Sequence, residues 1–192
     1  MTRLHDFTFY NSTDLRSNTR RVRGVKWSAP PIGTFKVNVD GAFHHITRKG
    51  GIGFVIRNSA GHMVAGGGRP LTGLQSAEHA ELLACSMAVA FLLHQEFRPA
   101  VVETAAPCDA LMVQRQVTNH IGSNTSPLGR LYDDLAAILA ANTDIHITYK
   151  GRTANMVAHI LAAHACSEPQ DFFFFSTPSF LQAAVAADVC LM

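Results

Sequence analysis

The stretch FKVNVDGAF, at residues 35–43, constrains the fold of this chain more than any other part of its sequence. Apolar residues alternate with polar ones along it: Phe35, Val37 and Val39 against Lys36, Asn38 and Asp40. Strict alternation indicates a β-strand with one buried and one solvated face. The strand ends on the carboxylate of Asp40, and the small residues Gly41 and Ala42 leave room beside it. Asp40 could therefore hold a metal ion, and the simpler interpretation is a solvated aspartate before a turn.

The composition suits one globular domain with short extensions. The chain has 192 residues, of which 47% are hydrophobic and 16% charged, so it can bury a core and is not disordered throughout. Its net charge of +2 permits nucleic-acid binding without requiring it. No apolar run approaches the ~20 residues of a membrane helix. The first residues lack the apolar core of a secretory signal.

The cysteines indicate the compartment. All 4 are isolated, with no CxxC pair, which is typical of reduced thiols in a cytoplasmic or nuclear protein. Residues 1–30 carry a loose cluster of Arg and Lys without periodicity, and we expect a flexible basic extension there.

The order of the remaining patterns predicts an α/β fold. After the first strand, short turns separate two further apolar runs, at 52–57 and 62–65, as in an antiparallel meander. Helical spacing begins at Ser76. A strand at 100–104, helices at 107–117 and 128–141, a strand at 144–149 and a helix at 152–165 follow. We therefore expect a mixed five-stranded sheet, a three-stranded meander plus parallel strands, flanked by helices. The domain should span 31–166, with 167–192 forming a tail with a short helix.

Five segments carry a resemblance to a known family. They are KVNVDGAF, GGIGFVIRNSAGHMV, AEHAELLACSMAVAF, VVET and GRTANMVAHILA. In order and spacing they resemble the ribonuclease H type-1-like domain of the plant retrotransposon-derived family, over roughly residues 26–166. The likeness continues into PSFLQAAVAADV near the end of the chain.

The resemblance implies a two-metal site that cleaves the RNA strand of an RNA·DNA hybrid with Mg²⁺. Asp40 and Glu81 match two of its acidic metal ligands, and His159 occupies the catalytic position where the family has a fourth acid. At the third acidic position stands Ala105. The resemblance also assigns nucleic-acid contacts to Asn155 and to Gly41.

The two departures weigh differently: His at position 159 is also found among plant relatives of the family, and it is Ala105 that predicts a weak or absent Mg²⁺ site. Imidazole is a poor ligand for Mg²⁺, and an alanine offers no ligand atom at all. Glu103, ~6.6 Å back along the strand, and Asp109, about one helical turn further on, are candidate substitutes. Each is more simply a surface acid. Glu78, just before the helical Glu81, adds an acid where a phosphate would approach.

Three functions remain open at this point. The first is a ribonuclease H-like module with little or no hydrolysis, retained to bind nucleic acid or protein. The second is an active hybrid ribonuclease that uses a substitute acid, and the third is a protein-interaction module. The apolar run Phe172–Phe175 either packs back onto the sheet, which we favour, or forms a partner-binding patch.

Overall fold

A computed structural model describes residues 26–105 and 127–189 of the chain. Its centre is a mixed sheet of six strands in the order β5-β4-β1-β2-β3-β6. The strands are β1 (Phe35–His44), β2 (Lys49–Arg57), β3 (Met63–Leu71), β4 (Ala100–Thr104), β5 (Ile145–Tyr149) and β6 (Phe172–Phe174). The first three form the predicted antiparallel meander, while β4 runs parallel to β1 and β5 parallel to β4. The expected class of fold is confirmed, with six strands in place of five.

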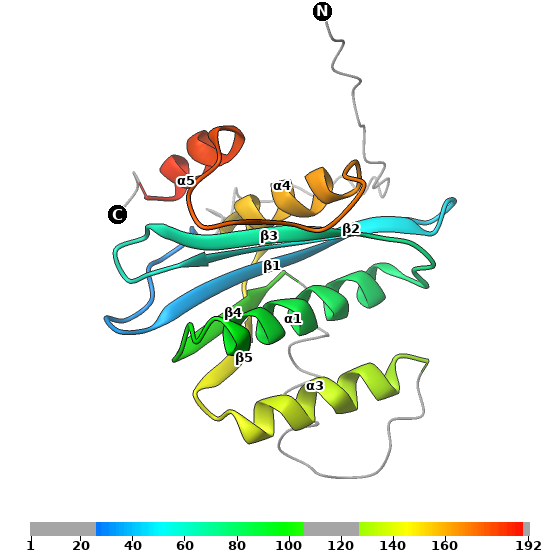
Figure 1. Cartoon of the computed structure of the whole chain (residues 1–192), viewed down its shortest axis with the longest axis horizontal. Helices are drawn as coiled ribbons and strands as arrows, with labels where there is room; N and C mark the ends of the chain where they lie inside the picture. Colours follow the sequence, from blue (N-terminus) through cyan, green and yellow to red (C-terminus); the bar gives the residue numbers. More distant parts are fainter. Residues whose placement is uncertain (1–25, 106–126, 190–192) are drawn as a thin grey trace, which may run out of the picture.

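Helices cover both faces of the sheet (Figure 1). They are α1 (Ala77–His94), α3 (Gly129–Ala141), α4 (Met156–Ala165) and α5 (Gln182–Val189), with 3₁₀ turns η1 (Arg152–Ala154) and η2 (Ser179–Leu181). Helices α1 and α3 lie on one side, and α4 and α5 on the other (Figure 1). None of the described helices is long and apolar enough to cross a membrane. The basic cluster expected before residue 26, the helix expected at 107–117 and Asp109 lie outside the described residues.

Strand β1 is buried on both faces, so the expectation of a solvated polar face was wrong. Val37 and Val39 are fully buried in the core that includes the apolar side of α1. On the other face Lys36, Asn38 and Asp40 are only 6%, 1% and 7% exposed. The physical reason is position: β1 lies at the centre of the sheet, and α4 and Trp27 cover its second face. Polar groups there need protein partners in place of water.

Glycines bring the helices unusually close to the sheet. A Cβ on Gly41 would lie 2.6 Å from the backbone nitrogen of Glu81 in α1. A Cβ on Gly53 would lie 2.4 Å from the backbone nitrogen of Ala162 in α4. Gly51 and Gly53 both lie inside β2. Their missing side chains therefore set the distance of α4 from the sheet.

The C-terminal region adds a strand to the sheet. Phe172–Phe174 pair antiparallel with Gly66–Gly68 of β3, so the prediction that the phenylalanine run packs back onto the sheet is confirmed. A second, smaller core forms on the α4 side, where Leu181 is fully buried against Val55 and Leu161. The ion pair between Arg57 of β2 and Asp188 of α5, 2.8 Å long, fastens the last helix to the sheet.

Candidate active site

Asp40 lies in the middle of β1, on the face that α4 covers, so the expectation that the strand ends at this residue was wrong. It pairs with Gly53 of β2, the glycine against which α4 packs. On its other side β1 and β4 run parallel, with Val39 paired to Thr104. The next positions in that register are Asp40 and Ala105. Ala105 stands where the family has its third acidic ligand, and in this register it is the neighbour of Asp40, which matches the first.

His159 bonds directly to Asp40. Its Nδ1 lies 2.9 Å from Asp40 Oδ2, and the two side chains are 55% and 10% exposed. This hydrogen bond raises the pKa of His159, while partial burial and the nearby charge of Arg152 oppose the rise. When the imidazole is protonated, its charge neutralises the Asp40 carboxylate.

Asn155 holds the strand of Asp40 and the helix of His159 in place relative to each other. It is 2% exposed, and its Nδ2 donates to the carbonyl oxygen of Val39 at 2.6 Å, one residue before Asp40. Its own carbonyl oxygen accepts from the backbone N–H of His159 in the first turn of α4. Asn155 thus joins the start of the helix to the strand that carries Asp40. A contact between Asn155, or Gly41, and nucleic acid stays a prediction.

Glu81 enters the site from the second turn of α1. Ser76 caps this helix by accepting from the backbone N–H of His79 at 3.1 Å. Gly41 then lets the helix approach β1 at the residue beside Asp40. The Glu81 carboxylate accepts a hydrogen bond from Thr104 Oγ1 at 3.2 Å. Since Thr104 directly precedes Ala105, Glu81 lies near the position of the missing third acid, where the end of β4 borders the middle of β1.

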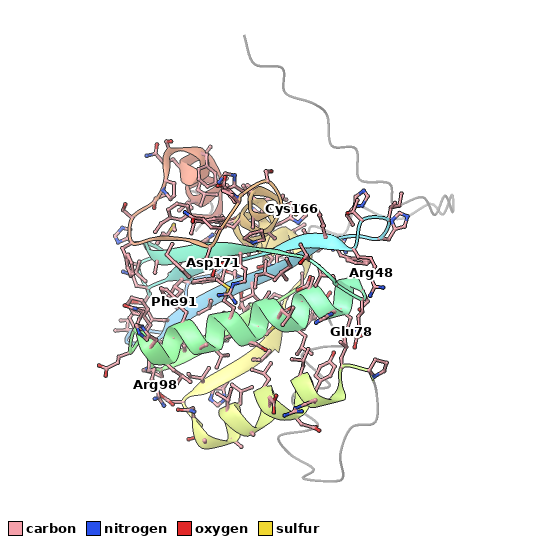
Figure 2. All side chains as sticks on the ribbon, turned by 45° about the vertical axis from the view of Figure 1, so that its right-hand side comes forward. Arg48, Glu78, Phe91, Arg98, Cys166 and Asp171 are labelled. Carbon is pink, nitrogen blue, oxygen red and sulfur yellow. The ribbon has the colours of Figure 1, made fainter. Side chains whose placement is uncertain are left out.

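The acid at Glu78 has a structural partner. Tyr132 of α3 is almost fully buried, and its hydroxyl donates to Glu78 Oε1 at 2.8 Å. This bond joins α3 to the first turn of α1. Figure 2 shows Glu78 at that end of α1, on the same side of the molecule as Arg48.

Glu103 belongs to a buried polar network, so its expected place on the surface was wrong. One carboxylate oxygen lies 2.7 Å from Lys36 Nζ and the other accepts from Asn38 Nδ2 at 3.0 Å. Glu103 is only 3% exposed. Asn38 Oδ1 in turn accepts from Trp27 Nε1 at 2.8 Å, and Lys36 also donates to the carbonyl oxygen of Ser28. Both oxygens of Glu103 are therefore committed to the fold.

Sequence reasoning missed this network, although a signal for it exists. Residues 36, 38 and 103 are polar residues on strands that lie at the centre of the sheet. A polar residue on a doubly covered strand must find a partner, and an acid and a base on neighbouring strands are the natural pair. To predict the network, one would have needed to know that β1 and β4 are neighbouring strands.

The donors that the structure describes do not fit a pair of Mg²⁺ ions. Across residues 26–105 and 127–189, no three or more His, Cys, Asp or Glu side chains form a group that could hold a metal. Mg²⁺ requires near-octahedral oxygen ligands. Asp40 already bonds to an imidazole, and Ala105 contributes only a methyl group. Asn155 adds a buried oxygen that has no hydrogen-bond partner in this part of the chain, but a neutral amide does not replace a carboxylate.

Comparisons with known proteins agree with this architecture. Residues 38–165 match the model of the reverse transcriptase-like family. No curated protein matches the chain. Among solved structures, RNase H1 from the archaeon Halobacterium salinarum is similar with 24% identity and a TM-score of 0.56, over 69% of this chain and 96% of that one.

Two further similar structures contain nucleic acid. LC11-RNase H1 in complex with an RNA/DNA hybrid has 21% identity and a TM-score of 0.55, over 69% of this chain and 96% of that one. The foamy viral protease-reverse transcriptase in complex with an RNA/DNA hybrid has 17% identity and a TM-score of 0.57, over 84% of this chain and 24% of that one. At these identities the likeness shows the fold alone. From its fold and from the family match over residues 38–165, this chain belongs to the reverse transcriptase-like family and contains a ribonuclease H-like domain.

Proposed function

We propose that this chain is a ribonuclease H-like module that binds nucleic acid, with RNA·DNA hybrid as the first candidate, and that hydrolyses it little or not at all. The single observation that carries the proposal is the place of Ala105, which directly follows β4 where Thr104 pairs with Val39, the residue before Asp40. A third carboxylate belongs at Ala105 by the family pattern, and a methyl group stands there. The motif resemblance further supports descent from a plant retrotransposon.

The charge balance supports a weak or absent Mg²⁺ site. Two divalent ions bring four positive charges, and the chain offers the carboxylates of Asp40 and Glu81 against them. The imidazole of His159 competes for the first of these carboxylates. Of the two acids that could replace the missing third ligand, Glu103 is held by Lys36 and Asn38, and Asp109 lies outside the described residues. An active hybrid ribonuclease is therefore the second candidate.

Binding to the nucleic-acid backbone has support from the surface around His159. Arg152, exposed in η1, lies close enough to His159 to act against protonation of its ring. Lys150 precedes it by two residues. The two similar structures described above hold RNA/DNA hybrids. With a net charge of only +2, binding should be weak and should fall steeply with salt, because it depends on release of counterions.

Fluorescence anisotropy with a labelled RNA·DNA hybrid tests the proposal. We expect binding at low salt that weakens as salt rises, with the label remaining on intact RNA after incubation with Mg²⁺ or Mn²⁺. Arg152→Gln should weaken binding, whereas Arg130→Gln, an exposed arginine on α3, serves as the matched control and should leave it unchanged. Absence of binding at low salt would overturn the binding role. Rapid cleavage of the hybrid would overturn the degenerate site.

A further inference from the structure

An apolar groove lies at the other side of the molecule from the His159–Asp40 pair. It has a volume of about 580 Å³ and runs between α1 and the outer strands of the sheet. Its lining is mostly aliphatic and aromatic, including Leu71, Met87, Phe91, Phe173 and Phe175. Figure 2 labels Phe91 on α1 and Asp171 just before β6. Since β6 lies beyond residue 165, this wall of the groove falls outside the family match.

Two phenylalanines of the C-terminal region form one wall and also project from it. Phe173 stacks on Phe91, with ring centroids 5.5 Å apart and planes inclined by 14°. Phe175 lies 6.2 Å from the same ring. They are nevertheless 45% and 61% exposed. The missing side chain of Gly67 gives Phe173 its place, because a Cβ there would lie 2.8 Å from its ring.

Among the strands that the structure describes, β6 lies at one edge of the sheet, and every residue in it is phenylalanine. An exposed, uncharged, apolar edge strand invites pairing with another chain. The nearest charges on the rim neutralise each other, since Arg69 and Asp171 form an ion pair 2.6 Å long. A surface of this kind does not repel a copy of itself.

We propose that two copies of this chain associate through this surface, with the β6 strands paired antiparallel about a two-fold axis. Phe175 of each copy then enters the groove of the other. A two-fold interface requires a self-complementary patch. Here a projecting ring and a groove lie side by side, and antiparallel pairing of an all-phenylalanine strand places ring against ring in any register. In the dimer, the exposed ring of Phe175 and the apolar groove are both buried in each copy.

The interface leaves the Asp40 site open, and the inference does not rest on the proposed function. Asp40 and His159 lie on the α4 side, whereas the groove lies on the α1 side of the sheet. Three strand residues and two exposed rings per copy make a small interface, below the roughly 1,200 Å² at which stable interfaces begin. We therefore expect a dimer with a dissociation constant in the micromolar range.

Sedimentation velocity across the micromolar range tests the dimer. Ala90 is exposed on α1 and lines the groove, and arginine is a strong helix former, so Ala90→Arg should fold normally while filling the groove. We expect it to raise the dissociation constant about tenfold or more. The matched control is Ala137→Arg, an exposed alanine in the middle of α3, which should dimerise as the wild type does.

A second variant, Phe175→Ser, removes the projecting ring without changing a residue of the helix and should also shift the chain toward monomer. Circular dichroism checks that each variant is folded. A wild type that stays monomeric at every concentration overturns the proposal. So does a dimer that neither Ala90→Arg nor Phe175→Ser weakens, or one that Ala137→Arg disrupts equally.

Discussion

Replacing Glu103 by glutamine separates a structural acid from a substitute metal ligand. In the structure its carboxylate pairs with Lys36 at 2.7 Å, and the two side chains are 4% and 7% exposed. Glutamine keeps the shape and one oxygen acceptor but removes the negative charge. Lys36 would remain buried with the carbonyl oxygen of Ser28 as its other partner. A glutamate that served only as a metal ligand would give the opposite result, with stability kept and any activity lost.

The size of the effect follows from the burial of both groups. Removing one partner of a buried ion pair costs about 3–5 kcal/mol, because it leaves an uncompensated charge. Since the amide oxygen can still accept from Asn38 or Lys36, we expect Glu103→Gln at the lower end, about 3 kcal/mol. For a chain of this size that corresponds to a fall in Tm of roughly 6–12 °C. Lys36→Met combined with Glu103→Gln should cost clearly less than the sum of the single changes.

Urea unfolding followed by circular dichroism measures these free energies. Glu168→Gln is the matched control, since Glu168 pairs with His164 on a partly exposed helix end and its loss should change stability by less than about 0.5 kcal/mol. If Glu103→Gln unfolded like the control, or if its effect simply added to that of Lys36→Met, the buried network would not hold the fold as described.

Three further predictions follow from other contacts. Asp188→Asn leaves the buried Arg57 guanidinium without its counter-charge and should cost about 3 kcal/mol or more in urea unfolding; no loss would mean that α5 does not need this pair. Gly53→Ala should lower Tm, because the new Cβ would lie 2.4 Å from the backbone of α4, whereas Gly151→Ala meets nothing within 4 Å and should not. The pKa of His159 is raised by its aspartate partner, so the pair stabilises the fold fully below the ordinary histidine pKa and ceases to do so as pH rises through the higher folded-state value. The stability difference between wild type and His159→Ala should therefore shrink over that rise; a constant difference would contradict it.

Local patterns in the sequence predicted most of the architecture. The alternation at 35–43 and the run at 100–104 correspond closely to β1 and β4. The helical spacing after Ser76 begins where α1 is capped. These signals are local, because each depends on which residues of one element face the core.

What could not be predicted depends on contacts between distant parts of the chain. The polar face of β1 is buried because Lys36 meets Glu103, 67 positions away in the sequence, and no periodicity records that pairing. The triple glycine Gly66–Gly68 weakened the pattern of the third strand, yet β3 continues through it because β6 packs there. For the candidate site, motif order supplied the positions, while the bond between His159 and Asp40 required the structure.

Restoring the missing acids tests whether the loss of carboxylates at positions 105 and 159 keeps this chain from hydrolysing RNA·DNA hybrid. Cleavage of a labelled RNA·DNA hybrid should be measured with Mg²⁺ for the wild type, Ala105→Asp, and the double variant Ala105→Asp/His159→Asp. We predict negligible cleavage by the wild type and the highest rate for the double variant, because the two carboxylates return beside Asp40 and Glu81. A wild type that cleaves the hybrid as fast as the double variant, and loses that activity in Asp40→Asn, would contradict it.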